Sequence, residues 1–263
     1  MLQFEFMRNA LMAGLFVSIL CPFVGLFLVL KRYSMMGDTL SHASFAGIAI
    51  GLVSGLNPII TSFIFTSACG LLIEYLRNYY KKYSELVMSI ILTLSIGIAI
   101  LIMSTGKAGS SVNSILFGNM LTVSKSDLIW MAIIGVISFI FIFFLYNKLI
   151  YATFDEEGAK VSGVNVSLVN YIFTLIVAAT ISISIRILGV LVISSMIVVP
   201  VATAMQLKKG FKSTLLYSIL FGFIDIFTGF FISYKLDTAT GGTIALTSVV
   251  VLTIILIINK YRR

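Results

Sequence analysis

The stretch LIWMAIIGVISFIFIFFLYN, residues 128–147, runs for 20 positions without a charged side chain. A helix of about 20 apolar residues is long enough to cross the hydrocarbon core of a bilayer. Eight further apolar runs are spread along the chain, at residues 9–30, 38–56, 58–76, 86–104, 166–185, 187–207, 213–233 and 243–259. The sequence therefore predicts an all-α, polytopic transmembrane helical bundle of eight or nine spans, in a single domain over residues 1–263.

Composition and charge support a membrane protein. Hydrophobic residues make up 59% of the chain and charged residues 11%, whereas soluble domains are roughly 25% charged. If the N-terminus faces the outside, 13 of the 18 lysines and arginines fall in inner loops, as the positive-inside rule requires. The N-terminus is therefore predicted outside. Anionic lipid accounts for the net charge of +8, so no nucleic-acid partner is expected.

One aspartate and the only histidine lie four residues apart in GDTLSHAS, residues 37–44. In a helix this spacing places Asp38 and His42 on one face. Ionisable groups at membrane depth mark transport paths or buried pairs. A carboxylate and an imidazole form half of a divalent-metal site, which a homodimer would complete without thiolates. A structural hydrogen-bonded pair is the alternative, and periodicity leaves open whether residues 34–56 form one helix or a broken one.

Two further acidic residues, Asp225 and Glu74, and the two cysteines also lie in the apolar runs. Asp225 lies deep in an apolar run and is a candidate for either a pathway or a packing role. Glu74 precedes Arg77 by three residues near an inner boundary, which predicts a local ion pair. Cys21 and Cys69 are expected to be small buried hydrophobic side chains.

Two longer loops interrupt the apolar runs. Residues 105–127, rich in Gly, Ser and Asn, are expected outside, with a short interfacial helix at residues 115–117. Residues 152–165, ATFDEEGAKVSGVN, are expected inside. Their acidic start suits a helix N-terminus, and Gly163 suits a helix end. A short amphipathic helix on the inner face is therefore predicted, with a solvated acidic loop as the alternative.

The chain lacks the motifs of catalysis and of ATP hydrolysis. Any Ser-His-Asp arrangement would have to use His42. Gly106-Lys107 is not a P-loop, because it lacks the upstream glycine and is followed by Ala108. The chain is therefore not expected to be an enzyme, and active transport would require ATP hydrolysis in a separate subunit.

Several stretches of the sequence resemble the ABC-3 permease family, the membrane subunits of bacterial ABC importers for zinc and manganese. They are LKRYSMMGDTLSHASFAGIAIGL at residues 30–52, ILFGNMLTVSKSDL at 115–128 and LGVLVISSMIVVPVATA at 188–204, with weaker matches at 154–164 and 229–246. Together they cover the chain nearly end to end. Asp225 matches no family motif.

The resemblance implies a permease homodimer in the bacterial cell membrane, two ATP-binding cassette subunits on the cytoplasmic side and an extracytoplasmic metal-binding protein. It implies that Asp38 and His42 line or gate the metal path. It also implies that residues 154–164 form a coupling helix engaging the ATPase; the residues concerned are Phe154, Asp155, Glu156, Glu157, Gly158, Ala159 and Gly163.

The resemblance also bears on the transported ion. The sequences of residues 37–44 and of GLNP at 55–58 are most similar to those of zinc permeases. Transported Zn²⁺ is therefore expected, with no stably bound cofactor. Import of Mn²⁺ or iron(II) by the same architecture is one alternative. A proton-coupled secondary carrier that uses Asp38, His42 and Asp225 as a relay is another.

Overall fold

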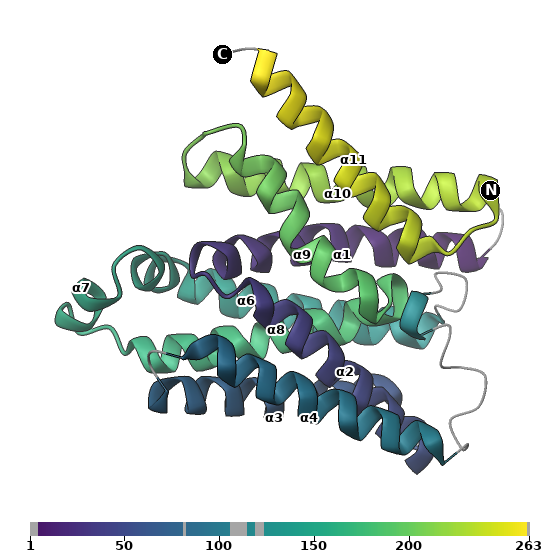
Figure 1. Ribbon diagram of the computed structural model, residues 1–263, viewed down its shortest axis with the longest axis horizontal. Coiled ribbons are helices and arrows are strands. Elements are labelled where there is room, and N and C mark those ends of the chain that lie inside the picture. The colour runs from purple at the N-terminus through teal and green to yellow at the C-terminus, as the bar shows by residue number, and fades with distance from the viewer. Residues whose placement is uncertain (1–4, 81–82, 106–114, 119–123, 262–263) are drawn as a thin grey trace.

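The computed structural model describes residues 5–80, 83–105, 115–118 and 124–261. All regular structure in these ranges is helical, and they contain no strand. The helices are α1 (Glu5–Leu30), α2 (Ser34–Ser54), α3 (Pro58–Tyr79), α4 (Ser84–Ser104), α6 (Lys125–Phe154), α7 (Glu156–Val161), α8 (Val166–Leu188), α9 (Val190–Met205), α10 (Phe211–Leu236) and α11 (Thr240–Tyr261). The long helices run back and forth between two ends of the bundle, and α7 lies at one of these ends (Figure 1).

Local sequence signals set several helix boundaries. The side chain of Asn57 accepts a hydrogen bond from the Ile59 amide, and Pro58 occupies the first turn of α3, where its missing N–H costs nothing. Gly55 ends α2 in the left-handed conformation, with a φ of 68°. The largest departure from the predicted spans is in α6, which continues to Phe154 because residues 148–154 contain neither glycine nor proline.

Seven of the described helices are long and apolar enough to cross a membrane, namely α1, α3, α4, α6, α8, α10 and α11. The helices α2 and α9 are not among them. The helix α2 contains polar residues such as Asp38 and His42, and α9 has only 16 residues. Both nevertheless run between the same two ends as the other seven (Figure 1). The number of spans and the side of the N-terminus stay predictions.

The helix that carries Asp38 and His42 is continuous from Ser34 to Ser54, so the alternative of a broken helix is wrong. It packs against α3, α4, α8 and α9. Small residues allow the close approach to α3: a Cβ atom on Gly47 would lie 2.6 Å from the Ser62 Cα atom.

The buried core of the bundle draws on most of the long helices. It includes Phe27 of α1, Leu40 of α2, Ile73 of α3 and Ile181 of α8, each with almost no exposed surface. Cys21 and Cys69 are buried and not disulfide-bonded, as the sequence predicts. The core therefore follows the apolar pattern of the sequence.

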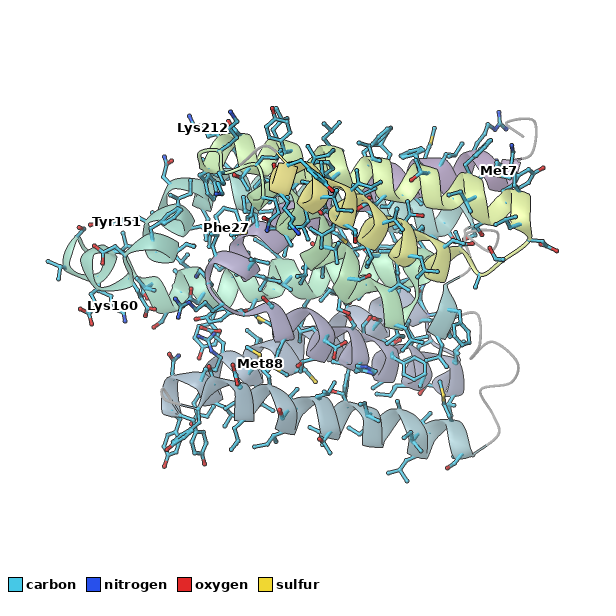
Figure 2. The ribbon with its side chains drawn as sticks, turned by 45° about the horizontal axis from the view of Figure 1, so that its top comes forward. Met7, Phe27, Met88, Tyr151, Lys160 and Lys212 are labelled. Atoms are coloured by element: carbon cyan, nitrogen blue, oxygen red, sulfur yellow. The ribbon has the colours of Figure 1, made fainter. Side chains whose placement is uncertain are left out.

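The labelled side chains in Figure 2 show which residues lie at each end of the bundle. Lys160 and Tyr151 lie at the end that carries α7 and Lys212 lies toward it, whereas Met7 lies at the opposite end (Figure 2). The predicted outer loop, residues 105–127, lies mostly outside the described residues, but residues 115–117 are helical.

Candidate metal centre

Asp38 and His42 lie on one face of α2, one helical turn apart. The Asp38 Oδ1 atom is 4.0 Å from the His42 Nε2 atom. Two tetrahedral ligands of one zinc ion are about 3.4 Å apart, given bonds of about 2.1 Å, so a small side-chain rotation would let both contact one ion. The two residues are roughly 6 and 12 Å along the helix axis from Ser34, in the half of α2 nearer α7.

The face that carries the pair is the open face of α2. The Asp38 side chain is 48% exposed and the His42 side chain 21%, and Met35, one turn earlier, is 44% exposed. The intervening residues on the other faces, such as Leu40 and Ser41, are buried. Both polar groups therefore point toward the surface of the single chain, not into its core.

Within the described residues, a single copy of the chain offers the pair no further His, Cys, Asp or Glu ligand. The described residues contain no group of three or more His, Cys, Asp or Glu side chains that could hold a metal ion. Asp225, the third residue of the predicted relay, is fully buried in α10, and its two carboxylate oxygens have no hydrogen-bond partner in the described structure. It does not join Asp38 and His42 in one cluster.

The neighbouring helix α9 also has an open stripe. Leu191 and Met205, near the two ends of α9, are 54% and 40% exposed, and Val198 between them is half-buried. Their spacing is that of one helical face. Because α2 packs against α9, the two open stripes belong to adjacent helices.

The predicted coupling helix is shorter than residues 154–164. Phe154 is the last residue of α6, and the chain turns at Asp155, so only Glu156–Val161 form the helix α7. The Asp155 side chain caps α7 by accepting a hydrogen bond of 2.9 Å from the Gly158 amide. Glu156 pairs with Lys160 at 2.6 Å, on the exposed side.

The other side of α7 faces the bundle, and its end is marked by glycine. Ala159 is fully buried and packs with Ala152 and Val166. Gly163 follows the helix with a φ of 82°, which explains the glycine there. Glu157 is exposed. The segment is therefore an amphipathic helix, and its role stays a prediction.

A polar cluster, the corner cluster, consists of Tyr33, Glu74 and Arg77, where α1 turns into α2 beside the end of α3. The Arg77 Nη1 atom donates to the Glu74 Oε2 atom at 2.9 Å, so the ion pair predicted from the spacing is confirmed. Arg77 also donates to the Tyr33 hydroxyl, and its guanidinium carbon lies 3.7 Å from the centre of the Tyr33 ring. Sequence reasoning missed Tyr33, because this contact joins residues 44 positions apart.

Lys31 lies at the same corner, just beyond the end of α1. Its Nζ atom donates to the Asn170 Oδ1 atom of α8 at 2.5 Å. Burial lowers the pKa of Lys31 from 10.5 to about 8, although the carboxylates of Glu74 and Glu156 favour the charged form. Because Glu156 belongs to α7, the charges of this corner and of α7 influence each other.

A bundle of long apolar helices is the architecture of a multi-pass membrane protein, and the carboxylate–imidazole pair on the open face of α2 supplies ligand types that metal ions accept. The comparisons with known proteins agree with this class. The family model described as the ABC 3 transport family matches residues 3–259. The chain therefore belongs to the ABC-3 family, which confirms the resemblance found in the sequence.

Relatives over the full length carry metal-transport names. The chain is 44% identical over 263 residues to a probable metal transport system membrane protein of Treponema pallidum, covering 100% of this chain and 99% of that protein. It is 31% identical over 248 residues to the high-affinity zinc uptake system membrane protein ZnuB of Buchnera aphidicola, covering 94% and 95%. Further relatives are named for iron transport and for manganese import.

A solved structure has the same fold. PsaBC from Streptococcus pneumoniae, in complex with Fab, matches with a TM-score of 0.87 and 28% identity, over 97% of this chain and 92% of that chain. The chain is therefore an all-helical, multi-pass cell-membrane protein and the permease of a metal ABC transporter, a transport subunit and not a catalytic enzyme.

Proposed function

We propose that this permease imports divalent transition-metal ions at the expense of ATP hydrolysed by partner subunits, and that Asp38 and His42 form its transient metal site. The observation that carries the proposal is the open face of α2, on which both groups stand 4.0 Å apart. A four-coordinate ion bound there would have half of its ligands. The other half would come from a second copy of the chain.

A homodimer fits the shape of the open surface. The partly exposed stripe of α2 carries the polar pair, and the adjoining stripe of α9 is apolar, with Leu191 and Met205 exposed. If two copies meet along these stripes, the apolar residues are covered and two carboxylates and two imidazoles converge. This arrangement would place the ion path at the junction between the copies.

The ligand chemistry suits an ion that must also be released. Two imidazole nitrogens and two carboxylate oxygens match a tetrahedral zinc site. The two cysteines, which would bind zinc more tightly, are buried elsewhere in the bundle. We favour Zn²⁺ on these grounds; carboxylates also suit Mn²⁺ and imidazoles also suit iron(II), and relatives are named for all three metals.

The partner subunits would engage opposite ends of the bundle. Two ATP-binding cassette subunits would dock on α7, whose exposed Glu156, Glu157 and Lys160 offer charged contacts. The inner side of the membrane would then be the end with α7, and the beginning of α1 would lie outside. An extracytoplasmic metal-binding protein would deliver the ion at that outer end.

The direct experiment measures metal uptake and metal-stimulated ATPase activity of the assembled complex. The wild type is compared with Asp38→Ala and His42→Ala, and each protein is tested with Zn²⁺ and with Mn²⁺. Loss of groups that merely orient metal ligands costs 10- to 100-fold in affinity, so loss of a ligand is expected to reduce uptake at least about tenfold. Asp237→Ala, which removes an exposed carboxylate, is the matched control. Wild-type uptake by both ligand variants would contradict the proposal.

A proton-coupled carrier is the second candidate, and Asp225 is the observation that favours it. Its carboxyl group is fully buried and has no hydrogen-bond partner within the described ranges. Such a group can bind and release a proton. Metal transport by the purified chain in liposomes, driven by a pH gradient without any ATPase, would support this candidate, and dependence on ATP would exclude it.

A further inference from the structure

We infer that the corner cluster of Tyr33, Glu74 and Arg77 consists of positioning residues for the metal pair. The three side chains hold the first turn of α2 and thereby fix where Asp38 and His42 stand in the ion path. The inference rests on the metal site proposed above. It assigns a role in transport to three groups that do not touch the ion.

The metal pair has little support of its own. Asp38 and His42 lie 4.0 Å from each other, and among the described residues neither side chain has another polar partner. Metal-binding histidines normally donate their second ring N–H to a carboxylate or carbonyl group, which fixes the ring. Here the position of both ligands therefore depends on the position of α2 as a rigid body.

The start of α2 is a strained corner. Arg32 has a φ of 59°, in the left-handed region that usually takes glycine. The Tyr33 amide donates to the Leu28 carbonyl at 2.8 Å and closes the turn at the end of α1. Tyr33 is the N-cap residue of α2, but its side chain does not cap the helix. The Tyr33 side chain instead contacts Arg77.

The corner cluster ties this corner to α3. The Glu74 side chain is 3% exposed and that of Arg77 is 13% exposed. A buried carboxylate requires a paired cation, so Arg77 is held in place by Glu74. Arg77 in turn contacts Tyr33 twice, through the hydroxyl and through the face of the ring. Tyr33 is therefore anchored to a fixed charge pair.

The short distance to the metal pair makes the anchor effective. Asp38 lies five positions after Tyr33, a rise of roughly 7.5 Å along the helix. The helix between them is continuous. A shift of the corner would therefore reach Asp38 almost undiminished, and it would change the geometry that the two copies offer to an ion.

The test uses the assembled complex with Tyr33→Phe, Arg77→Gln and the charge-neutral double variant Glu74→Gln with Arg77→Gln. Tyr79→Phe is the matched control, because Tyr79 is 77% exposed at the same end of α3. Loss of one hydrogen bond to a charged group is expected to raise the half-saturating zinc concentration of the ATPase by up to about tenfold. Metal-free ATPase activity is expected to stay unchanged, and Arg77→Lys is expected to restore part of the loss.

A second readout follows the corner without relying on transport. Met35→Cys places a thiol on the open face of α2, one turn before Asp38, and the native cysteines are buried. The maleimide labelling rate of this thiol, or the mobility of a spin label on it, is expected to change when Tyr33→Phe or the double variant is added. Tyr79→Phe is expected to change neither quantity.

Equal half-saturation and equal labelling in the cluster variants and in Tyr79→Phe would overturn the inference. A fall in maximal ATPase rate with unchanged half-saturation would also overturn it, because that result indicates general damage. If the wild-type complex shows no metal stimulation, the proposed metal site fails, and the labelling of Met35→Cys still tests the corner by itself.

Discussion

Asp38 and Glu74 are two acidic residues in different surroundings. The Glu74 side chain is almost fully buried and has Arg77 beside it, whereas the Asp38 side chain is 48% exposed and has the His42 imidazole 4.0 Å away. A carboxylate that is buried without a paired cation is costly, so the near-complete burial of Glu74 depends on Arg77. Glu74 is therefore used within the structure, whereas the carboxyl group of Asp38 lies on an open helix face.

Lys31 provides a pH-dependent prediction. Its buried amine is expected to titrate near pH 8, below the ordinary value of 10.5. NMR titration of the protein with ¹³C-dimethylated lysines should reveal one resonance with this low pKa, and Lys31→Arg should remove it. A titration of every lysine near 10.5 would contradict the burial of Lys31 beside Asn170.

The sign of the stability change follows from the same shift. The folded protein releases the Lys31 proton near pH 8, and the unfolded chain releases it near 10.5. Between these values the unfolded state binds more protons, so this residue makes the free energy of unfolding rise as the pH increases from about 8 to 10.5. Below pH 8 the destabilisation by the buried ammonium group is fully present.

The contact between α2 and α3 depends on small side chains. Gly47 faces α3 so closely that an added Cβ atom would lie 2.6 Å from the Ser62 Cα atom, and the Ser44 and Ser62 hydroxyls are 2.6 Å apart. Apolar side chains gain little by leaving lipid for a contact with another helix, so close packing and polar contacts must hold membrane helices together. This contact sets the position of α2 from the side opposite its open face.

Substitution of Gly47 by alanine is expected to push α2 away from α3. Overpacking of this kind costs about 1–3 kcal/mol, so Gly47→Ala should lower the Tm of the protein in detergent. Gly97→Ala is the matched control, because Gly97 lies within α4 with no atom within 4 Å of an added Cβ. That variant is expected to leave the Tm unchanged or raise it slightly. Equal Tm changes in the two variants would contradict the close contact.

Sequence reasoning found the helices but not all of their ends. Apolar runs, caps such as Asn57-Pro58 and the glycine at residue 55 are local signals, and the helices follow them. The end of α6 at Phe154 depends on Asp155, where the backbone leaves the helix and the side chain begins to cap α7. Two adjoining helices share that residue, so the sequence pattern predicted the span too short, at residues 128–147, and the helix that follows too long, at residues 154–164.

The candidate site was predictable in its chemistry and not in its setting. The i, i+4 spacing placed Asp38 and His42 on one face, because helix geometry requires it. Which face of α2 stays open depends on the packing of α3, α4, α8 and α9, which no local pattern records. The contact of Tyr33 with Arg77 was missed for the same reason.

In the proposed mechanism, one end of the bundle couples transport to ATP hydrolysis and the opposite end admits the ion. The exposed charges of α7 lie at one end, and α1 begins at the other (Figure 1). The metal pair stands on α2 between them, on the surface of one copy. This arrangement gives a single chain half of a site, so the proposed mechanism depends on two copies.

The stoichiometry of metal binding tests this dependence most directly. Equilibrium dialysis of the purified transporter complex with zinc is expected to yield one ion for every two copies of the permease, and Asp38→Ala or His42→Ala should abolish that binding while Asp237→Ala retains it. One ion for each copy, or zinc bound equally well by the Asp38→Ala and His42→Ala proteins, would contradict a site shared between two α2 helices.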